Sequence, residues 1–497
     1  MWIAAALAAT ALLLARKLGL RGPNGEATSR TAAVVPPVVL VAALAVALAQ
    51  TVVVGVLSLF AHDLQVDAVG ATWLLTAFML ASAVATPIAG RLGDQHGHHR
   101  LILVGLLLLL VGSVVAAVST DHGWYAGALS GRVLQGLAGG VFPCTFGLAR
   151  QLVPSRRLPG VVAGLSAMFG VGGAAGMVAA GPLVDASNLA AVFWLVAGLA
   201  VVALIGTLLL PAPRPTASRT ARPDLLGGVL LAATLVALLL AVSQGRTWGW
   251  SSLPVLGLAC AAIVLGALFV LVEQRAAAPL VDLRLLVGRQ LLAINAVTVV
   301  IGVGMFAAVT LLPLFAQTPA HLGYGFGYSP SRSGLLIAPI GLFMVIAAPL
   351  TPRLARRIGA RAVFQVGAML AAVGLAGLAF LHHQPMTVAL SGAVLGLAYG
   401  FAFGSLGSLV VDAAAVEDTG TATGINTILR TVGGAIGSAI AVAIVAGSAK
   451  PGTTAPTESG YTTAFAASAL VALTAVVLAA AVRSSSSSGR VSADLSA

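Results

Sequence analysis

The chain has 497 residues, of which 59% are hydrophobic and only 8% are charged, and its formal net charge is +12. Soluble proteins carry about 25% charged residues, so 26 basic and 14 acidic side chains cannot cover the surface of a water-soluble chain of this length. The composition therefore predicts a protein embedded in a lipid bilayer, and it excludes cytosolic enzymes, nucleic-acid binders and secreted disulfide-rich proteins. The two cysteines lie in separate apolar runs and give no redox or metal signal, and we expect no cofactor.

The first 34 residues form a separate N-terminal segment. Residues 1–15 are largely apolar and uncharged, but at 1.5 Å per residue such a helix reaches only about 22 Å, which is short of a ~30 Å hydrocarbon core. We expect a short apolar helix in this segment. An interfacial helix, an additional span and an over-extended gene start remain open readings.

The rest of the chain contains long apolar runs between charged or Gly/Pro/Ser-rich breaks, and a helix needs about 20 apolar residues to cross a bilayer. No period-2 alternation of short strands occurs, which excludes a barrel. The sequence therefore predicts an all-α membrane protein with 14 transmembrane helices, near residues 35–59, 70–90, 101–119, 124–147, 159–184, 189–211, 225–243, 253–272, 290–316, 333–351, 362–381, 386–411, 419–447 and 462–482.

The basic residues predict the orientation. Of the 26 Lys and Arg residues, three fall in one set of loops (Arg246, Arg332 and Lys450), two fall within helices (Arg132 and Arg430), and the remaining 21 fall on the other side. Positive charge is retained on the cytoplasmic side. We therefore expect a multi-pass protein of the plasma (inner) membrane with a cytoplasmic C-terminus.

An internal repeat indicates two related halves. The loop GRLGDQHGHHRLILVG at 90–105 aligns with PRLARRIGARAVFQVG at 352–367 at an offset of 262 residues, with five identical positions. Recurrence on the same membrane side is typical of transporters built from two parallel repeats. The predicted organisation begins with an N-terminal segment (1–34). Two pseudo-symmetric six-helix bundles (35–211 and 290–482) follow, with a linker and two inserted central helices between them (212–289). A Ser-rich cytoplasmic tail (483–497) ends the chain.

Several motifs then resemble one family. Gly90-Arg91-Leu92-Gly93-Asp94-x-x-Gly97 resembles the signature loop of the major facilitator superfamily, and Arg132-x-x-Gln135-Gly136 resembles its helix-4 motif. Three further motifs resemble its fourteen-helix drug:proton antiporter branch: Asp224-Leu225-Leu226-Gly227, Gly249-Trp250 and Gly424-x-Asn426-x-x-x-Arg430-x-x-Gly433-Gly434. The resemblance runs from about residue 35 to 482 and implies export of small compounds by alternating access, with proton antiport.

The signature loop contains a candidate conformational latch. Asp94 is the only carboxylate in this loop, among Arg91, Arg100 and three histidines, and Gly90 and Gly97 supply its tight geometry. A solvated turn is the simpler reading. A carboxylate at a helix N-terminus gains about 0.3–1 kcal/mol from the helix dipole, and in similar transporters this loop stabilises the outward-facing state. We therefore predict that the loop acts as an ion-pair latch.

Two arginines and several amides are candidates for the cavity. A charge at the bilayer centre costs roughly 2.5–3.5 kcal/mol on insertion scales, so such a residue must face protein or water. The simpler reading is that each arginine bonds carbonyls of a neighbouring helix. The predicted cavity and substrate residues are Arg132, Gln135, Arg430, Asn426, Gln50 and Asn295.

The fifth predicted span is rich in glycine and predicts a hinge at Gly172, Gly173, Gly176, Gly181 and Pro182. In the first span the antiporter branch usually carries an aspartate, whereas this chain has no acid around Gln50. Its fourteen acidic residues all map to loops, termini or helix ends, although a proton-coupled carrier needs a titratable group within its pathway. Proton coupling therefore stays open.

The sequence favours a monomeric secondary active transporter and no enzyme. It is expected to export small amphipathic compounds, such as a drug, an antibiotic or a lipid-like metabolite, with protons as a candidate partner ion and no nucleic acid. Because the buried charges are positive, we expect a neutral or anionic substrate. An uncoupled facilitator or lipid carrier of the same fold is one alternative, and a transport-inactive membrane sensor or binding protein is another.

Overall fold

The computed structural model describes residues 31–66, 68–213, 225–276, 288–415, 419–448 and 456–482. Every regular element in these ranges is a helix. A helix pairs its backbone N–H and C=O groups within one segment, which lipid requires because it offers no hydrogen bonds. Most of the predicted N-terminal segment, parts of the linker and the tail 483–497 lie outside the described residues.

The N-terminal half has its own hydrophobic core, formed by buried residues between Val35 and Leu210 with Val411 added. The buried faces of its helices converge on this core, while large apolar side chains also lie exposed on their outer faces. Its elements are α2 (Thr31–Thr51), η1 (Val54–Val56), α3 (Leu57–Asp63), α4 (Ala68–His96), α5 (His98–Asp121), α6 (Tyr125–Leu137), η2 (Ala138–Gly140), α7 (Val141–Leu152), α8 (Leu158–Ala186) and α9 (Ala191–Leu209).

The C-terminal half has a second core, formed by buried residues between Leu291 and Val482 with Ala167 added. The two long helices α10 (Leu225–Trp248) and α11 (Leu253–Arg275) precede this half. Its own elements are α13 (Arg289–Gln317), η3 (Ala320–Leu322), α14 (Pro330–Ile358), α15 (Ala360–Phe380), α16 (Pro385–Ala413), α17 (Thr419–Gly447), α18 (Glu458–Leu478) and η5 (Ala479–Ala481).

Twelve of the described helices are long and apolar enough to cross a membrane, and α8 is a thirteenth candidate with a bend of 46° between Leu158–Gly173 and Val178–Ala186. The predicted span at 124–147 is formed by the shorter elements α6, η2 and α7. The predicted first span at 35–59 is too long, because α2 ends at Thr51 and the chain continues as η1 and α3. The count of fourteen spans remains a prediction.

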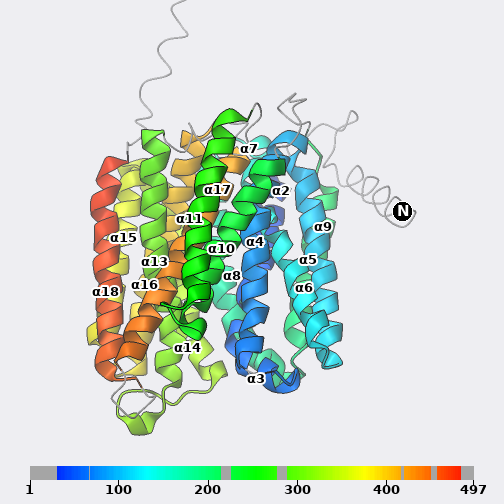
Figure 1. The fold of residues 1–497 in the computed structure, drawn as a ribbon. Helices are drawn as coiled ribbons and strands as arrows, with labels where there is room; N and C mark the ends of the chain where they lie inside the picture. Colours follow the sequence, from blue (N-terminus) through cyan, green and yellow to red (C-terminus); the bar gives the residue numbers. More distant parts are fainter. Residues whose placement is uncertain are drawn as a thin grey trace, which may run out of the picture.

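The two halves pack along α8, which contacts α14 and α16, and along α17, which contacts α4 and α7. The inserted pair α10 and α11 packs against itself, and α10 also contacts α4 and α17. Figure 1 shows α10 between the N-terminal helices, in blue and cyan, and the C-terminal helices, in green to red. The inserted pair therefore lies beside the interface of the two halves.

The repeated loops adopt the same backbone conformation. Gly97 separates α4 from α5 with φ 100° and ψ 124°, and Gly359 separates α14 from α15 with φ 85° and ψ 149°. Positive φ strains residues that have a Cβ atom. The recurrence of glycine at this offset thus has a physical cause, since each loop reverses the chain at a single residue.

Candidate functional site

Asp94 joins the two halves of the molecule. It lies in the last turn of α4 and is only 5% exposed. Its Oδ1 accepts a hydrogen bond from the backbone N–H of Gly420 at 3.1 Å, and its Oδ2 accepts from the N–H and the hydroxyl of Thr421 at 2.8 and 2.7 Å. These donors belong to the first turn of α17, where helical N–H groups lack intrahelical partners and the dipole favours an anion. Asp94 therefore caps a helix of the other half.

Two glycines permit this close approach. A Cβ on Gly90 would lie 2.7 Å from the carbonyl oxygen of Gly420, and a Cβ on Gly420 would lie 2.8 Å from Asp94 Oδ1. Arg91 is buried in the same turn, whereas Arg100 is exposed at the start of α5. The carboxylate of Asp94 thus contacts the N-terminus of α17 and a histidine, and the ion-pair latch remains a prediction.

That histidine, His98, was not predicted as a site residue. Its Nε2 lies 3.2 Å from Asp94 Oδ1, and both side chains are almost fully buried. The ring occupies a slot between glycines, since a Cβ on Gly93, Gly147 or Gly420 would lie within 2.8 Å of it. The one available sequence signal was its spacing of four residues from Asp94.

Arg150, at the end of α7, forms a second contact between the halves. Its Nη1 donates to the carbonyl oxygens of Val411 at 2.9 Å and Ala414 at 3.1 Å, and to the hydroxyl of Thr419 at 2.5 Å. It therefore bonds the C-terminal carbonyls of α16, where a cation is favoured, and the first residue of α17. The sequence analysis missed Arg150 because a basic residue at the end of a helix is common in membrane proteins.

Arg132 lies inside the N-terminal half and is fully buried. It donates to the carbonyl oxygens of Leu74 at 2.9 Å and Ala49 at 2.8 Å, and to Oε1 of Gln135 at 2.6 Å. Gln135 in turn donates to the hydroxyl of Ser113 at 2.8 Å. This network links α2, α4, α5 and α6, and neither Arg132 nor Gln135 is among the residues that line the two cavities described here.

Arg430, on α17, has different surroundings. Its guanidinium carbon lies 3.9 Å from the ring centre of Phe169, 5.1 Å from that of Phe403 and 5.5 Å from that of Phe142. The three rings come from α8, α16 and α7, so both halves contribute to the cage. Nε and Nη2 are buried and have no hydrogen-bond partner among the described residues.

A cavity of about 300 Å³ lies beside this cage, lined by residues that include Ser166, Phe403, Asn426 and Arg430. Asn426 also donates to Asn295 Oδ1 at 3.1 Å and to the hydroxyl of Thr298 at 2.8 Å. These bonds tie α17 to α13. Asn426 thus has a packing role and lines the cavity, whereas Asn295 does not line either cavity.

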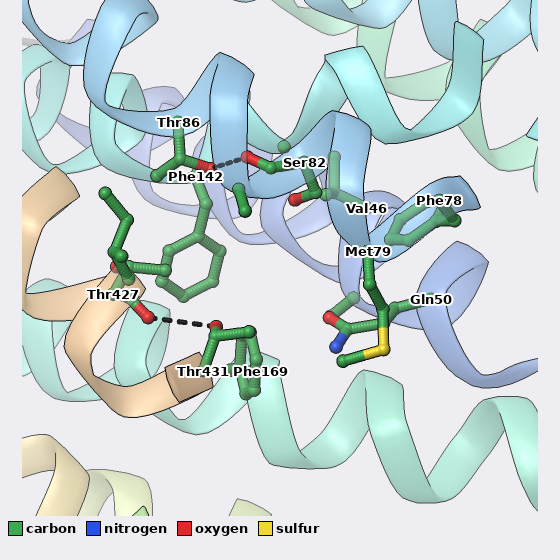
Figure 2. Close-up of a pocket in the computed structure, with 14 residues that line it drawn as sticks. Val46, Gln50, Phe78, Met79, Ser82, Thr86, Phe142, Phe169, Thr427 and Thr431 are labelled. Atoms are coloured by element: carbon green, nitrogen blue, oxygen red, sulfur yellow. Dashed lines mark hydrogen bonds between the residues drawn. The ribbon is translucent and has the colours of Figure 1, made fainter. Parts of the chain in front are cut away.

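A larger cavity of about 500 Å³ lies between α2, α4, α7, α8 and α17, and Gln50 is part of its wall. Figure 2 shows its lining side chains, which are mainly apolar with several hydroxyl groups. None of the described residues that line either cavity is a carboxylate. The labelled residues are Val46, Gln50, Phe78, Met79, Ser82, Thr86, Phe142, Phe169, Thr427 and Thr431.

The glycines predicted as a hinge lie where α8 packs against α2. A Cβ on Gly172 would lie 2.5 Å from Ala47 Cβ, and a Cβ on Gly176 would lie 2.4 Å from Thr51 Oγ1. A Cβ on Gly173 would meet no atom closer than 3.8 Å. The 46° bend falls between Gly173 and Val178, before Gly181 and Pro182. The bend therefore falls in a region of close contact between these two helices.

Two helical halves that enclose cavities at their interface form the architecture of a secondary transporter. The sequence profile of the Major Facilitator Superfamily matches residues 39–438. The chain belongs to this superfamily, and it is a multi-pass membrane protein of that type.

Two curated relatives and one solved structure are similar to the chain. An uncharacterised MFS-type transporter of Mycobacterium tuberculosis is 32% identical over 76% of this chain and 54% of its own length. The tetracenomycin C resistance and export protein of Streptomyces glaucescens is 30% identical over 69% and 62%. The chain thus spans less than two thirds of these relatives. The crystal structure of the human organic anion transporter MFSD10 (TETRAN) shares the fold, with a TM-score of 0.61, 16% identity, and coverage of 90% of this chain and 99% of that chain.

Proposed function

We propose that the chain exports a small amphipathic compound across the inner membrane by alternating access, and that the compound is neutral or anionic. The relative from Streptomyces glaucescens is named for resistance to and export of tetracenomycin C, which supports a drug-like or antibiotic substrate. The apolar walls and scattered hydroxyls of the cavity between the halves match the chemistry of an amphipathic compound.

The surroundings of Arg430 carry this proposal. The guanidinium lies between three aromatic rings at the interface of the halves, and two of its nitrogens have no hydrogen-bond partner among the described residues. Unsatisfied buried donors are costly, and Arg binds carboxylates in bidentate fashion. A bound acid or polarised carbonyl would satisfy them, whereas a cation at ~4 Å would be repelled by about 4 kcal/mol at an effective dielectric near 20.

The contacts of Asp94 and Arg150 support the alternating-access mechanism. Both connect the N-terminal half to the start of α17 at the same end of the molecule. We infer that they hold this end closed and separate when the transporter opens there. The excess of arginines in the adjoining loops supports assigning this end to the cytoplasm, within a topology of 14 spans in which α6, η2 and α7 together form the fourth.

Two mechanisms are candidates for the energetics of transport, one coupled to protons and one uncoupled. The resemblance of the chain's motifs to the drug:proton antiporter branch favours proton antiport. The lack of a carboxylate among the described cavity-lining residues favours an uncoupled facilitator or lipid carrier as the second candidate. Substrate flux in proteoliposomes, with and without an imposed pH gradient, distinguishes the two, and a lack of any flux would support the transport-inactive sensor.

The charge preference is tested with purified protein and two dyes of similar size, the cation ethidium and the anion fluorescein. We expect fluorescein to bind at least about tenfold more tightly, which corresponds to about 1.4 kcal/mol. Arg430→Gln should remove this preference. Arg332→Gln, which removes the same charge from an exposed position at the other end of the molecule, should leave it unchanged. Tighter binding of ethidium, or an unchanged preference in Arg430→Gln, would contradict the proposal.

A further inference from the structure

We propose that His382, His383 and Glu458 form a binding site for a divalent transition metal, with Zn²⁺ the ion that fits best. The histidines lie in the turn between α15 and α16, and Glu458 is the first residue of α18. Because α17 starts at the Asp94 contact and runs the length of the molecule, this site lies at the opposite end of the C-terminal half (Figure 1).

Three ligand atoms converge there. His382 Nε2 lies 2.9 Å from Glu458 Oε1, His383 Nδ1 lies 3.5 Å from the same oxygen, and all three ligand atoms lie within 4.8 Å of one another. With bonds of about 2.0–2.2 Å, tetrahedral Zn²⁺ needs ligand atoms roughly 3.3 Å apart. Small side-chain rotations would therefore bring two imidazoles and one carboxylate into coordination, with the fourth position open to water.

The backbone hydrogen bonds of His382 determine its tautomer. Its Nδ1 lies 3.0 Å from the carbonyl oxygens of Leu378 and Ala379, which can only accept, so Nδ1 must donate. In the neutral ring, Nε2 then presents a lone pair to the carboxylate oxygen of Glu458. Two lone-pair atoms 2.9 Å apart repel unless they share a proton or bind a metal ion, and to bind a metal ion they need to move only slightly apart. Metal-binding histidines characteristically donate their other N–H to such a carbonyl.

Burial and exposure also suit an ion that enters from solvent. The side chain of His382 is 4% exposed and is held edge-on against Phe315, whereas those of His383 and Glu458 are 71% and 40% exposed. One ligand is thus fixed and two can close on the ion. The carbonyl end of α15, which His382 caps, carries the negative end of the helix dipole and favours a cation.

The bound ion would tie the α15–α16 turn to α18. All these elements belong to the C-terminal half, so the ion should stabilise that half without joining it to the other. The proposal is therefore independent of the transport function.

The test uses the full chain purified in detergent without a polyhistidine tag and stripped with a chelator. Titration of Zn²⁺ against a chromogenic chelator should give one tight site per chain, and Zn²⁺ should raise the melting temperature. Co²⁺ in its place should give the visible absorption bands of a tetrahedral nitrogen–oxygen site. We expect His382→Gln and Glu458→Gln each to weaken Zn²⁺ binding at least about tenfold.

His321→Gln is the matched control, because His321 is an exposed histidine in η3, in the connection between α13 and α14. It should leave Zn²⁺ binding unchanged. Equal affinity in the His382 and Glu458 variants would overturn the proposal. Absence of stoichiometric binding to the native chain at micromolar Zn²⁺ would also overturn it, and would mean that His382 and Glu458 share only a proton.

Discussion

At the scale of single residues, Arg132 and Arg430 are both buried guanidiniums within helices, but they differ in hydrogen bonding: one nitrogen of Arg132 (Nη2) and two of Arg430 (Nε and Nη2) have no partner among the described residues. Arg132 bonds two carbonyls and an amide of its own half. Arg430 lies in an aromatic cage between the halves with two nitrogens unpartnered among the described residues. The first arrangement stabilises the fold, and the second leaves donors available to a substrate.

Replacing Arg132 should therefore affect stability. Arg132→Ala removes three charge-assisted hydrogen bonds and leaves buried acceptors unpaired, so we expect a loss of about 3 kcal/mol in the free energy of unfolding. Thermal unfolding in detergent measures it. Arg430→Ala should cost clearly less and should impair ligand binding instead. Equal melting temperatures for the two variants would show that this distinction is wrong.

A substitution of Asp94 tests the contact between the two halves. Asp94→Asn keeps the size of the side chain but replaces a charged acceptor with an amide that cannot accept on both sides. Charge-assisted bonds are worth about 1.5–3 kcal/mol each, so the population open at the Arg-rich end should rise at least about tenfold. Thiol labelling of Thr427→Cys in the cavity, in a background without the native cysteines, measures this shift.

Arg100→Gln is the control for this experiment, because Arg100 lies in the same loop but is exposed. It should leave labelling of the cavity cysteine near the native rate. If Asp94→Asn labels no faster than this control, Asp94 is only a cap that stabilises α17.

At the scale of elements, the packing of α8 against α2 depends on glycine. The two helices are in close contact at Gly172 and Gly176, and α8 bends within the same region. Close approach through small residues is the usual way in which membrane helices associate, since lipid provides no hydrophobic force between them. Motion of α8 during transport would then be limited by this contact.

A pair of alanine substitutions tests this contact. Gly176→Ala places a Cβ 2.4 Å from Thr51 Oγ1 and 2.9 Å from the Leu48 carbonyl oxygen, so it should destabilise the protein by about 1–3 kcal/mol through overpacking. Gly173→Ala meets no atom closer than 3.8 Å and should be neutral. Melting temperatures compare the two variants, and equal values would mean that the helices separate without cost.

At the scale of the whole molecule, two hydrophobic cores pack against each other along α8 and α17, are hydrogen-bonded at one end through Asp94 and Arg150, and enclose cavities between them. Separate cores allow each half to move as a unit while its internal packing stays intact. The inserted pair α10 and α11 contacts both halves through α4 and α17, which positions it to follow either half during such a movement.

The topology is tested by labelling in intact cells. With fourteen spans and a cytoplasmic start, Ser487→Cys in the C-terminal tail should resist a membrane-impermeant thiol reagent. Ser251→Cys, at an exposed position between α10 and α11, should react readily. Ready labelling at position 487 would rule out an even number of spans with this orientation.

The sequence by itself determined the helical membrane class, most helix positions and the repeated loops, because apolar run length, arginine placement and the glycine between paired helices are local properties. For α17, the predicted span 419–447 coincides with the observed helix. The break of the fourth predicted span into α6, η2 and α7 was not foreseen, although Gly139, Gly140 and Pro143 lie at it, because the run is apolar on both sides of these residues.

Only the tertiary structure decided which side chains meet. Asp94 and Thr421 are 327 residues apart, and His382 and Glu458 are 76 apart, so no local spacing could pair them. The sequence likewise made Arg132 and Arg430 equivalent cavity candidates, whereas the structure distinguishes them by their partners, carbonyl and amide oxygens for Arg132 and aromatic rings for Arg430. Which face of a helix meets a cavity depends on how all the neighbouring helices pack, and that arrangement is set by the two cores together.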